Sequence, residues 1–184
     1  SLAKKYLDDE EIIRITNNEL VAINREDLGG DFSNLSKAGF SLALETSSYT
    51  LITIARQASK YFSKTGGSVI SMTFDASNRV YPGYNVMGIA KAALENINRQ
   101  LSAEYGPRKI RFNSISAGPL PSLSARSIPG FTEMRKAHEQ RSPIKRPITH
   151  EEVANTALFL VSDLSTGITG SIIPVDGGYG IIAL

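Results

Sequence analysis

The amino-acid sequence predicts an α/β protein built as a doubly wound parallel sheet. Segments with helical spacing of apolar residues alternate with short β-rich runs, an order that places helices on both faces of a parallel sheet. The loops that follow the β-rich runs are rich in small and polar residues, as expected where ligands bind at the carboxyl ends of such strands. With 184 residues, 41% of them hydrophobic, the chain is long enough for one domain with a core.

The first half of the chain contains four expected elements. Residues 2–14 have a helix-forming composition, and residues 20–23 form a short apolar run typical of a strand. A glycine pair at 29–30 predicts a loop. Apolar residues then recur at mostly helical spacing over residues 37–62, which predicts a long, largely buried helix. Residues 68–73 are β-rich and predict a central strand.

The second half alternates in the same way. A second long helix is expected at residues 84–105, followed by a strand at 110–115 and a loop rich in glycine, proline and serine. Further helices are expected at 131–140 and 149–162, and a last short strand at 171–175. Thr149 and Glu152 have the spacing of a capping box at the start of the last helix.

Composition and charge exclude several classes of function. The 20 basic and 18 acidic residues are scattered along the chain, which argues against nucleic acid as a partner. The absence of cysteine excludes disulfides and thiolate metal sites, and it is compatible with a cytoplasmic location. His138 and His150 lack metal-ligand spacing, so we expect no metal site and place both on the solvated surface. No apolar run approaches the roughly 20 residues that span a bilayer, so no membrane segment is expected.

Tyr84 and Lys91 are the residues whose spacing indicates chemistry. Seven helical residues turn through about 700°, so both side chains project from one face two turns apart. A cation held near a phenol lowers its pKa from about 10 and makes it a proton donor or oxyanion stabiliser. The tyrosine also begins a helix after a strand and a polar loop, where the fold places the ligand site.

Longer motifs surround this pair. YNVMGIAKAALE begins at Tyr84, and NSISAGPL follows one strand later. Together with REDLGGDFSN, SSYTLITIAR, ARSIPGF and LVSDLSTGITGSIIPVDGGYG, they resemble the NADH-dependent enoyl-acyl-carrier-protein reductases, a branch of the short-chain dehydrogenase/reductases. The resemblance covers residues 24–184 and implies a Rossmann-like fold with NAD as cofactor. It also implies an enoyl substrate carried on acyl-carrier protein in fatty-acid synthesis, and a cytoplasmic homo-oligomer, a dimer or tetramer.

The resemblance assigns site residues position by position. Tyr84 matches the tyrosine that hydrogen-bonds the thioester carbonyl during reduction of the trans-2 double bond, and Lys91 matches the lysine that binds the nicotinamide ribose. The residues assigned to the cofactor are Lys91, Thr73, Gly118, Pro119, Leu120 and Ser122. Residues 125–140 resemble a mobile substrate-binding lid. The residues assigned to the substrate are Phe74, Tyr84, Met87, Ile128, Phe131 and Met134.

Two features depart from the family pattern. Phe74 stands ten residues before Tyr84, where many relatives carry a second tyrosine, so that hydroxyl is absent. No GxGxxG or related glycine-rich turn occurs, so the backbone amides that hold a pyrophosphate at a helix N-terminus are missing. Either residues precede Ser1 in the native protein, or this is a truncated form that does not bind NADH tightly. We therefore expect residues 1–184 to form one incomplete domain without recognisable N-terminal strands.

Two other functions stay open at this stage. Carbonyl reduction on the same fold would need a serine near the tyrosine loop, and Ser71 and Ser77 are the candidates. A non-catalytic fragment would instead persist by oligomerising, since the long helices at 37–62 and 84–105 pack across subunits in the relatives that the sequence resembles.

Overall fold

The computed structural model describes residues 29–62, 64–122, 125 and 128–183. The helix expected at residues 2–14 and the strand expected at 20–23 lie outside this part of the chain. No helix in the described part is both long and apolar enough to cross a bilayer.

Three parallel strands form the sheet of the described residues. They are β1 (Gly67–Thr73), β2 (Ile110–Ala117) and β3 (Ile172–Val175), and they lie side by side in that order. The register pairs Thr73 with Ser116 and Ala117 with Val175, so the carboxyl ends of neighbouring strands are nearly level. The segments that follow the three strands therefore begin at one edge of the sheet, as the sequence predicts.

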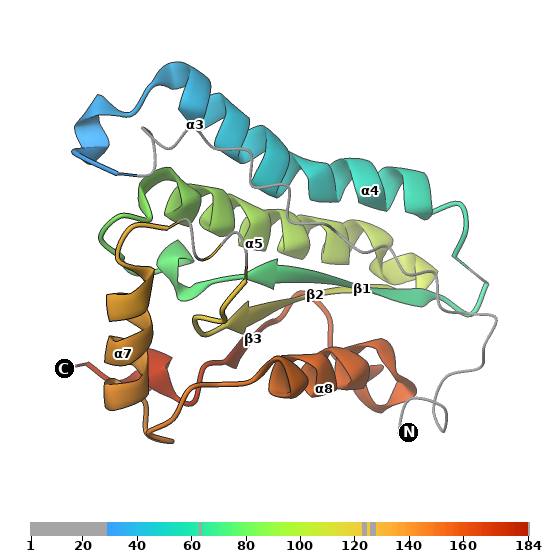
Figure 1. The fold of residues 1–184 in the computed structure, drawn as a ribbon. Helices are drawn as coiled ribbons and strands as arrows, with labels where there is room; N and C mark the ends of the chain where they lie inside the picture. Colours follow the sequence, from blue (N-terminus) through green and yellow to red (C-terminus); the bar gives the residue numbers. More distant parts are fainter. Residues whose placement is uncertain (1–28, 63, 123–124, 126–127, 184) are drawn as a thin grey trace.

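Helices cover both faces of this sheet (Figure 1). One face carries α5 (Asn85–Tyr105), and the opposite face carries α8 (His150–Val161). A further layer, α3 (Lys37–Leu44) and α4 (Thr50–Ala58), packs on the outside of α5. This arrangement confirms the predicted doubly wound α/β architecture.

The outermost helix differs from the sequence prediction in three ways. A π-helical turn at Glu45–Tyr49 separates α3 from α4, and the helix ends at Ala58 instead of residue 62. Within the π turn, the Ser48 hydroxyl donates a hydrogen bond to the carbonyl oxygen of Ala90 on α5 at 2.7 Å. The helix is also not largely buried, because only one of its faces meets α5: Phe40 is 37% exposed and Tyr49 is 49% exposed.

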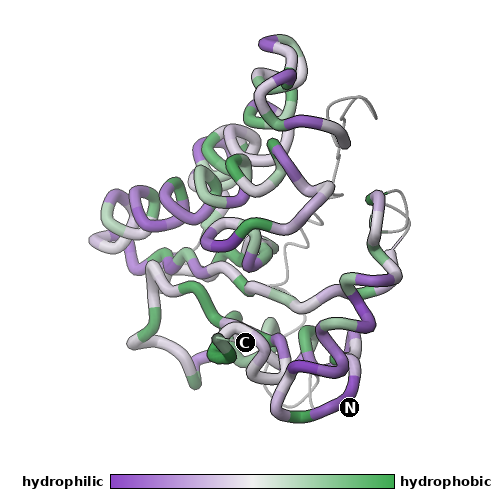
Figure 2. The backbone as a smooth tube through the Cα atoms, turned by 90° about the vertical axis from the view of Figure 1, so that its left-hand side faces the viewer, coloured by the Kyte–Doolittle hydropathy of each residue, from purple (hydrophilic) through white to green (hydrophobic). Residues whose placement is uncertain are grey.

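Apolar side chains of β2 alternate between two cores. Phe112 packs with Leu94 and Leu101 on the α5 side, whereas Ile115 packs with Leu160 on the α8 side. This alternation follows from the two-residue period of a strand, which sends successive side chains to opposite faces. Figure 2 shows hydrophobic and hydrophilic residues alternating along the helices as well, as expected for helices with one face in a core.

The start of α8 follows the sequence prediction closely. Thr149 is the N-cap, its hydroxyl accepts a hydrogen bond from the Glu152 backbone N–H, and the Glu152 carboxylate accepts one from the Thr149 N–H. The capping box is therefore confirmed. The remaining helix, α7 (Phe131–Arg141), lies at the end of the sheet where the strands terminate (Figure 1).

Candidate active site

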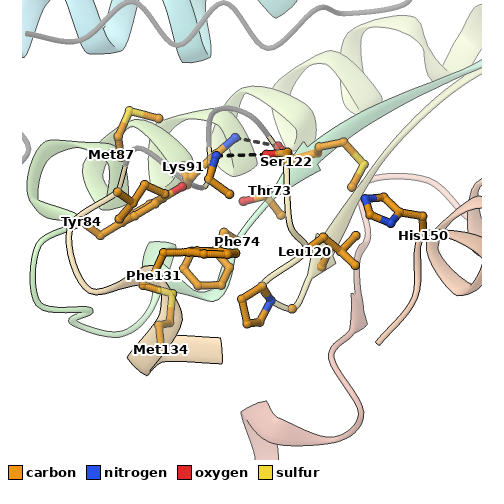
Figure 3. Close-up of a pocket in the computed structure, with 16 residues that line it drawn as sticks. Thr73, Phe74, Tyr84, Met87, Lys91, Leu120, Ser122, Phe131, Met134 and His150 are labelled. Atoms are coloured by element: carbon orange, nitrogen blue, oxygen red, sulfur yellow. Dashed lines mark hydrogen bonds between the residues drawn. The ribbon is translucent and has the colours of Figure 1, made fainter. Parts of the chain in front are cut away.

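A cavity of about 230 Å³ opens where the strands end, between α5 and α7. Figure 3 shows Tyr84, Met87 and Lys91 reaching it from α5, and Phe131 and Met134 from α7. The structure brings every residue that the sequence assigns to cofactor or substrate to this cavity. Its described lining consists of Met72, Thr73, Phe74, Tyr84, Met87, Lys91, Ala117, Gly118, Pro119, Leu120, Ser122, Ala125, Ile128, Phe131, Met134 and His150.

Tyr84 is the N-cap of α5, which begins at Asn85, one residue after the start expected from the sequence. A turn at Gly83, which has a φ of 81°, leads the chain into the helix, and this left-handed conformation favours glycine. The tyrosine is 9% exposed, and its ring meets the edge of Phe74 with 5.2 Å between ring centroids. Phe74 therefore packs against the Tyr84 ring, at the position where the resemblance leads one to expect a second tyrosine.

Lys91 lies two turns further along α5 and lines the same cavity. Its side chain is 8% exposed, and Nζ donates a hydrogen bond to the carbonyl oxygen of Met72 at 2.9 Å. No other lysine or arginine, and no aspartate or glutamate, is among the described lining residues. A positive charge surrounded by apolar side chains is suited to a ligand that carries oxygen atoms on an otherwise apolar body.

Thr73 is held by a residue that the sequence reasoning missed. Its hydroxyl donates a hydrogen bond of 2.7 Å to the carboxylate of Glu95, and both side chains are buried. Glu95 stands one turn after Lys91 on the same helix, and this i, i+4 spacing to a candidate site residue was the available signal. The Thr73 oxygen can therefore still accept a hydrogen bond from a ligand, whereas its proton is engaged.

The loop after β2 forms another wall of the cavity. Gly118 donates its backbone N–H to the carbonyl oxygen of Val175 on β3 at 2.9 Å. The hydroxyl of Ser122 accepts a hydrogen bond from the backbone N–H of Ala125 at 3.0 Å. The helix predicted at residues 131–140 is α7, which begins at Phe131 after Gly130 in a left-handed conformation with φ 75°.

His138 is the residue that the sequence analysis placed wrongly. It was expected on the solvated surface, but it is 4% exposed, stacked on Tyr179 with 4.7 Å between ring centroids. Burial lowers the pKa of its imidazole, against the opposing effects of the Asp176 charge and of a hydrogen bond to the Asp176 backbone. His150 is exposed, as expected, but it also lines the cavity.

Two other residues considered from the sequence do not reach the cavity. Ser71 is not part of the described lining, and its hydroxyl pairs with that of Ser114 at 2.7 Å inside the sheet. Ser77 lies in the short helical turn Asp75–Ser77 and is not part of the lining. Neither serine therefore supplies the hydroxyl that carbonyl reduction would need. The described residues also contain no group of three or more side chains suited to hold a metal ion.

Comparison with known proteins identifies the family. The family model described as "Enoyl-(Acyl carrier protein) reductase" matches residues 15–180. The chain belongs to the enoyl-(acyl carrier protein) reductase family. The resemblance drawn from its motifs is thereby confirmed.

Individual relatives agree with this assignment. The chain is 45% identical to the enoyl-[acyl-carrier-protein] reductase [NADH] FabI of Nostoc sp., over 90% of this chain and 64% of the relative. It is also 45% identical to the enoyl-[acyl-carrier-protein] reductase [NADPH] FabI of Staphylococcus aureus, over 86% of this chain and 62% of the relative. The chain thus spans less than two thirds of the length of these curated relatives.

A solved structure confirms the Rossmann-like fold. The enoyl-acyl carrier protein reductase of Bacillus cereus, solved with NADP+ and indole naphthyridinone, superposes with a TM-score of 0.85 at 44% identity. The match covers 88% of this chain and 63% of the other. The family member described here therefore shares the architecture of that enzyme over the part that the two have in common.

Proposed function

We propose that this protein reduces the trans-2 double bond of enoyl thioesters carried on acyl-carrier protein, with NADH as the reductant, in fatty-acid synthesis. The observation that carries the proposal is the placement of Tyr84 and Lys91 on one wall of an apolar cavity, in a member of the enoyl-(acyl carrier protein) reductase family. We also infer that the protein acts in the cytoplasm, the location expected from the sequence.

The residues around the cavity suit the nicotinamide half of such a cofactor. Lys91 offers ammonium protons to ribose hydroxyls, Ser122 offers a hydroxyl to phosphate, and Thr73 offers an oxygen acceptor. No glycine-rich turn of the kind that holds a pyrophosphate is found in the sequence, so the adenosine half has no corresponding site among the described residues. A bound reduced nicotinamide supplies hydride to the β-carbon of the substrate.

Tyr84 would act on the other end of the conjugated system. As hydride reaches the β-carbon, negative charge develops on the thioester oxygen, and the phenol of Tyr84 stabilises it by donating a hydrogen bond. The nearby ammonium of Lys91 and the N-terminal end of α5 both favour negative charge in this region. The α-carbon then takes up a proton, which completes the saturated thioester and leaves the cofactor oxidised.

The acyl part of the substrate would lie against apolar side chains. Met87, Ile128, Phe131 and Met134 line the cavity, and removing their surface from water favours binding of a hydrocarbon chain. A homo-oligomer, dimer or tetramer, is part of the proposal, because α3 and the π turn after it present the exposed apolar residues Phe40 and Tyr49 on the outer layer. Light scattering of the purified chain tests this assembly.

Turnover with a crotonyl thioester tests the proposed reaction. NADH and NADPH are titrated separately against the purified chain, and the crotonyl-dependent loss of dihydronicotinamide absorbance is followed. Crotonyl-dependent oxidation supports the proposal, and the ratio of the two cofactors' rates decides between them. Oxidation with an acetoacetyl thioester alone would instead indicate carbonyl reduction, and absence of both binding and turnover would indicate a non-catalytic fragment.

A further inference from the structure

His138 occupies a position on α7 that links the cavity wall to the rest of the molecule. Phe131, Met134 and His138 are spaced i, i+3 and i+7, so they share one face of the helix. The first two line the cavity, and the third is buried beyond it. Whatever holds His138 in place therefore also sets the position of the two apolar side chains that close the cavity.

The imidazole contacts two segments that follow neighbouring strands. On one side its ring stacks on Tyr179 of the turn η6 (Tyr179–Ile181), with 23° between ring planes. On another side Nε2 lies against Gly118: a Cβ added at Gly118 would stand 2.6 Å from this nitrogen. Nε2 has no hydrogen-bond partner and is buried. The ring thus fills the space between α7, the cavity loop and the turn after β3.

The turn after β3 is itself firmly built. The Asp176 carboxylate accepts hydrogen bonds from the backbone N–H groups of Gly178 at 2.8 Å and Gly180 at 2.7 Å. Gly118 is tied to the last residue of β3, Val175, by the hydrogen bond given above. Gly118 and the turn after β3 are therefore held in place by these hydrogen bonds, and the His138 imidazole is the part of α7 that contacts them.

We propose that His138 is a positioning residue that fixes α7, and with it Phe131 and Met134, against Gly118 and the turn at Asp176. Loss of this contact, by substitution or by a charge on the ring, releases the helix from the cavity wall. The consequence for substrate binding rests on the proposed function, whereas the anchoring of α7 does not.

The surroundings explain why a charged ring would release the helix. A second proton would have to go to Nε2, which faces the Gly118 backbone without an acceptor. Asp176 is the group whose charge opposes this cost, and burial outweighs it, since the pKa of His138 is lowered. The packed elements carry further charged or titratable groups: Tyr179 on η6, the α7 residues Glu133, Arg135, Lys136, Glu139 and Arg141, and the exposed Lys145 and Arg146 after it.

The test uses the fact that the chain has two histidines. In the 15N-labelled protein, the imidazole shifts of buried His138 and exposed His150 are followed against pH, together with the hydrogen exchange of the α7 amides. We expect His138 to titrate below the ordinary range of an imidazole, and α7 exchange to rise at least about tenfold as His138 takes up its proton. Protonation of His138 without any change in α7 exchange would overturn the proposal.

Variants separate anchoring from folding and from activity. His138→Ala should raise α7 exchange in the same way, and the exposed Gln140→Ala on the same helix is the matched control. His138→Phe keeps a ring on Tyr179 but takes up no proton, so it should retain α7 protection and abolish the dependence on pH. Equal exchange in His138→Ala and Gln140→Ala, or a persisting pH step in His138→Phe, contradicts the inference.

Kinetics provides an independent readout if the chain turns over crotonyl thioester. A positioning role predicts that His138→Ala raises KM several-fold more than it lowers kcat, and that His138→Phe restores KM. A fall in kcat alone would contradict the role. Absence of turnover in the unsubstituted chain would count against the proposed function, while the exchange measurements would still decide the anchoring.

Discussion

The Thr73 hydroxyl donates a hydrogen bond of 2.7 Å to the carboxylate of Glu95, and both side chains are buried. One turn earlier on the same helix, Lys91 donates to the carbonyl oxygen of Met72. Two consecutive residues at the tip of β1 are therefore tied to two consecutive turns of α5. This double link fixes the height of α5 against the sheet, and with it the position of the Lys91 ammonium at the cavity.

Removing the Thr73 hydroxyl should lower the free energy of unfolding, although the substitution changes few atoms. Thr73→Val keeps the shape of the side chain but leaves a buried carboxylate without its donor, and such losses amount to about 1–3 kcal/mol. Thr73→Ser retains the hydroxyl and should lose clearly less. Urea unfolding followed by circular dichroism measures both, and equal midpoints for Val and Ser variants would show that the hydrogen bond contributes nothing.

We expect substitution of Gly118 to destabilise the fold, because the ring of His138 occupies the space that a side chain would need. A Cβ at this position would stand 2.6 Å from Nε2 and 2.9 Å from Cε1 of His138, whose ring is held by its stack on Tyr179. Overpacking of this kind costs about 1–3 kcal/mol. Gly118→Ala should therefore lower the free energy of unfolding, and the same substitution in a His138→Ala background should cost less.

A matched glycine provides the control for this double-mutant cycle. Gly106 has a negative φ of −52°, and an added Cβ would meet nothing within 4 Å. Gly106→Ala should leave stability unchanged or raise it slightly, because alanine restricts the unfolded chain. Additive losses for Gly118→Ala and His138→Ala would show that the two sites do not interact, against the expectation from their contact.

Features that depend on local sequence could be predicted. The strands β1 to β3, the long helix α5 and the capping box of α8 all follow from hydrophobic period and from residues close in sequence. The spacing of Tyr84 and Lys91 also belongs to this class, since a helix alone determines that both point to the same side. That Tyr84 and Lys91 share one cavity with residues that follow the strands could also be predicted, because ligands bind at the carboxyl ends of parallel strands.

Features that depend on distant packing could not be predicted. The π turn at Glu45–Tyr49 accompanies a hydrogen bond from Ser48 to Ala90, a partner 42 residues away. His138 looks like a surface residue within its polar helix, and it is buried because Tyr179 and Gly118, from two other segments, close around it. Glu95 is an intermediate case: its i, i+4 spacing from Lys91 was a signal in the sequence, but its partner Thr73 is set by the packing of β1 beside α5.

The capping box of α8 should contribute measurably to stability. Thr149→Ala removes the acceptor for the Glu152 backbone N–H, and N-cap losses of this type cost about 1 kcal/mol. Thr149→Ser should retain most of that stability because serine is an equivalent N-cap. Thermal unfolding of the two variants checks the prediction, and a loss in the serine variant as large as that in alanine would contradict the capping role.

Glu152 should make stability depend on pH in the acid range. Its hydrogen bonds with the Arg146 side chain and then with the Thr149 backbone lower its pKa from 4.5 to about 2. Because the pKa in the folded state is below that in the unfolded state, the stabilisation is fully present above pH 4.5 and is lost as the pH falls toward 2. Glu152→Gln should flatten the unfolding profile in this window only. High salt should weaken the effect as well, since the pair is exposed.

The phenol of Tyr84 is the group on which the proposed reaction depends most. Tyr84→Phe keeps the ring, and so its contact with Phe74, but it removes the donor to the developing oxyanion. Loss of one such donor lowers kcat by roughly 10²–10³. We expect a fall of this size with crotonyl thioester, while KM and the affinity for NADH change little, because the hydroxyl acts mainly on the charge formed during the reaction.

A second tyrosine on the same helix gives the matched control for this substitution. Tyr105 ends α5 and packs on Phe112 in the core, away from the cavity lining. Tyr105→Phe should therefore leave kcat unchanged, and circular dichroism of both variants verifies that α5 is intact. If Tyr84→Phe retained the unsubstituted kcat, the developing charge would have to be stabilised by another group, and Lys91 would be the nearest charged candidate on this wall of the cavity.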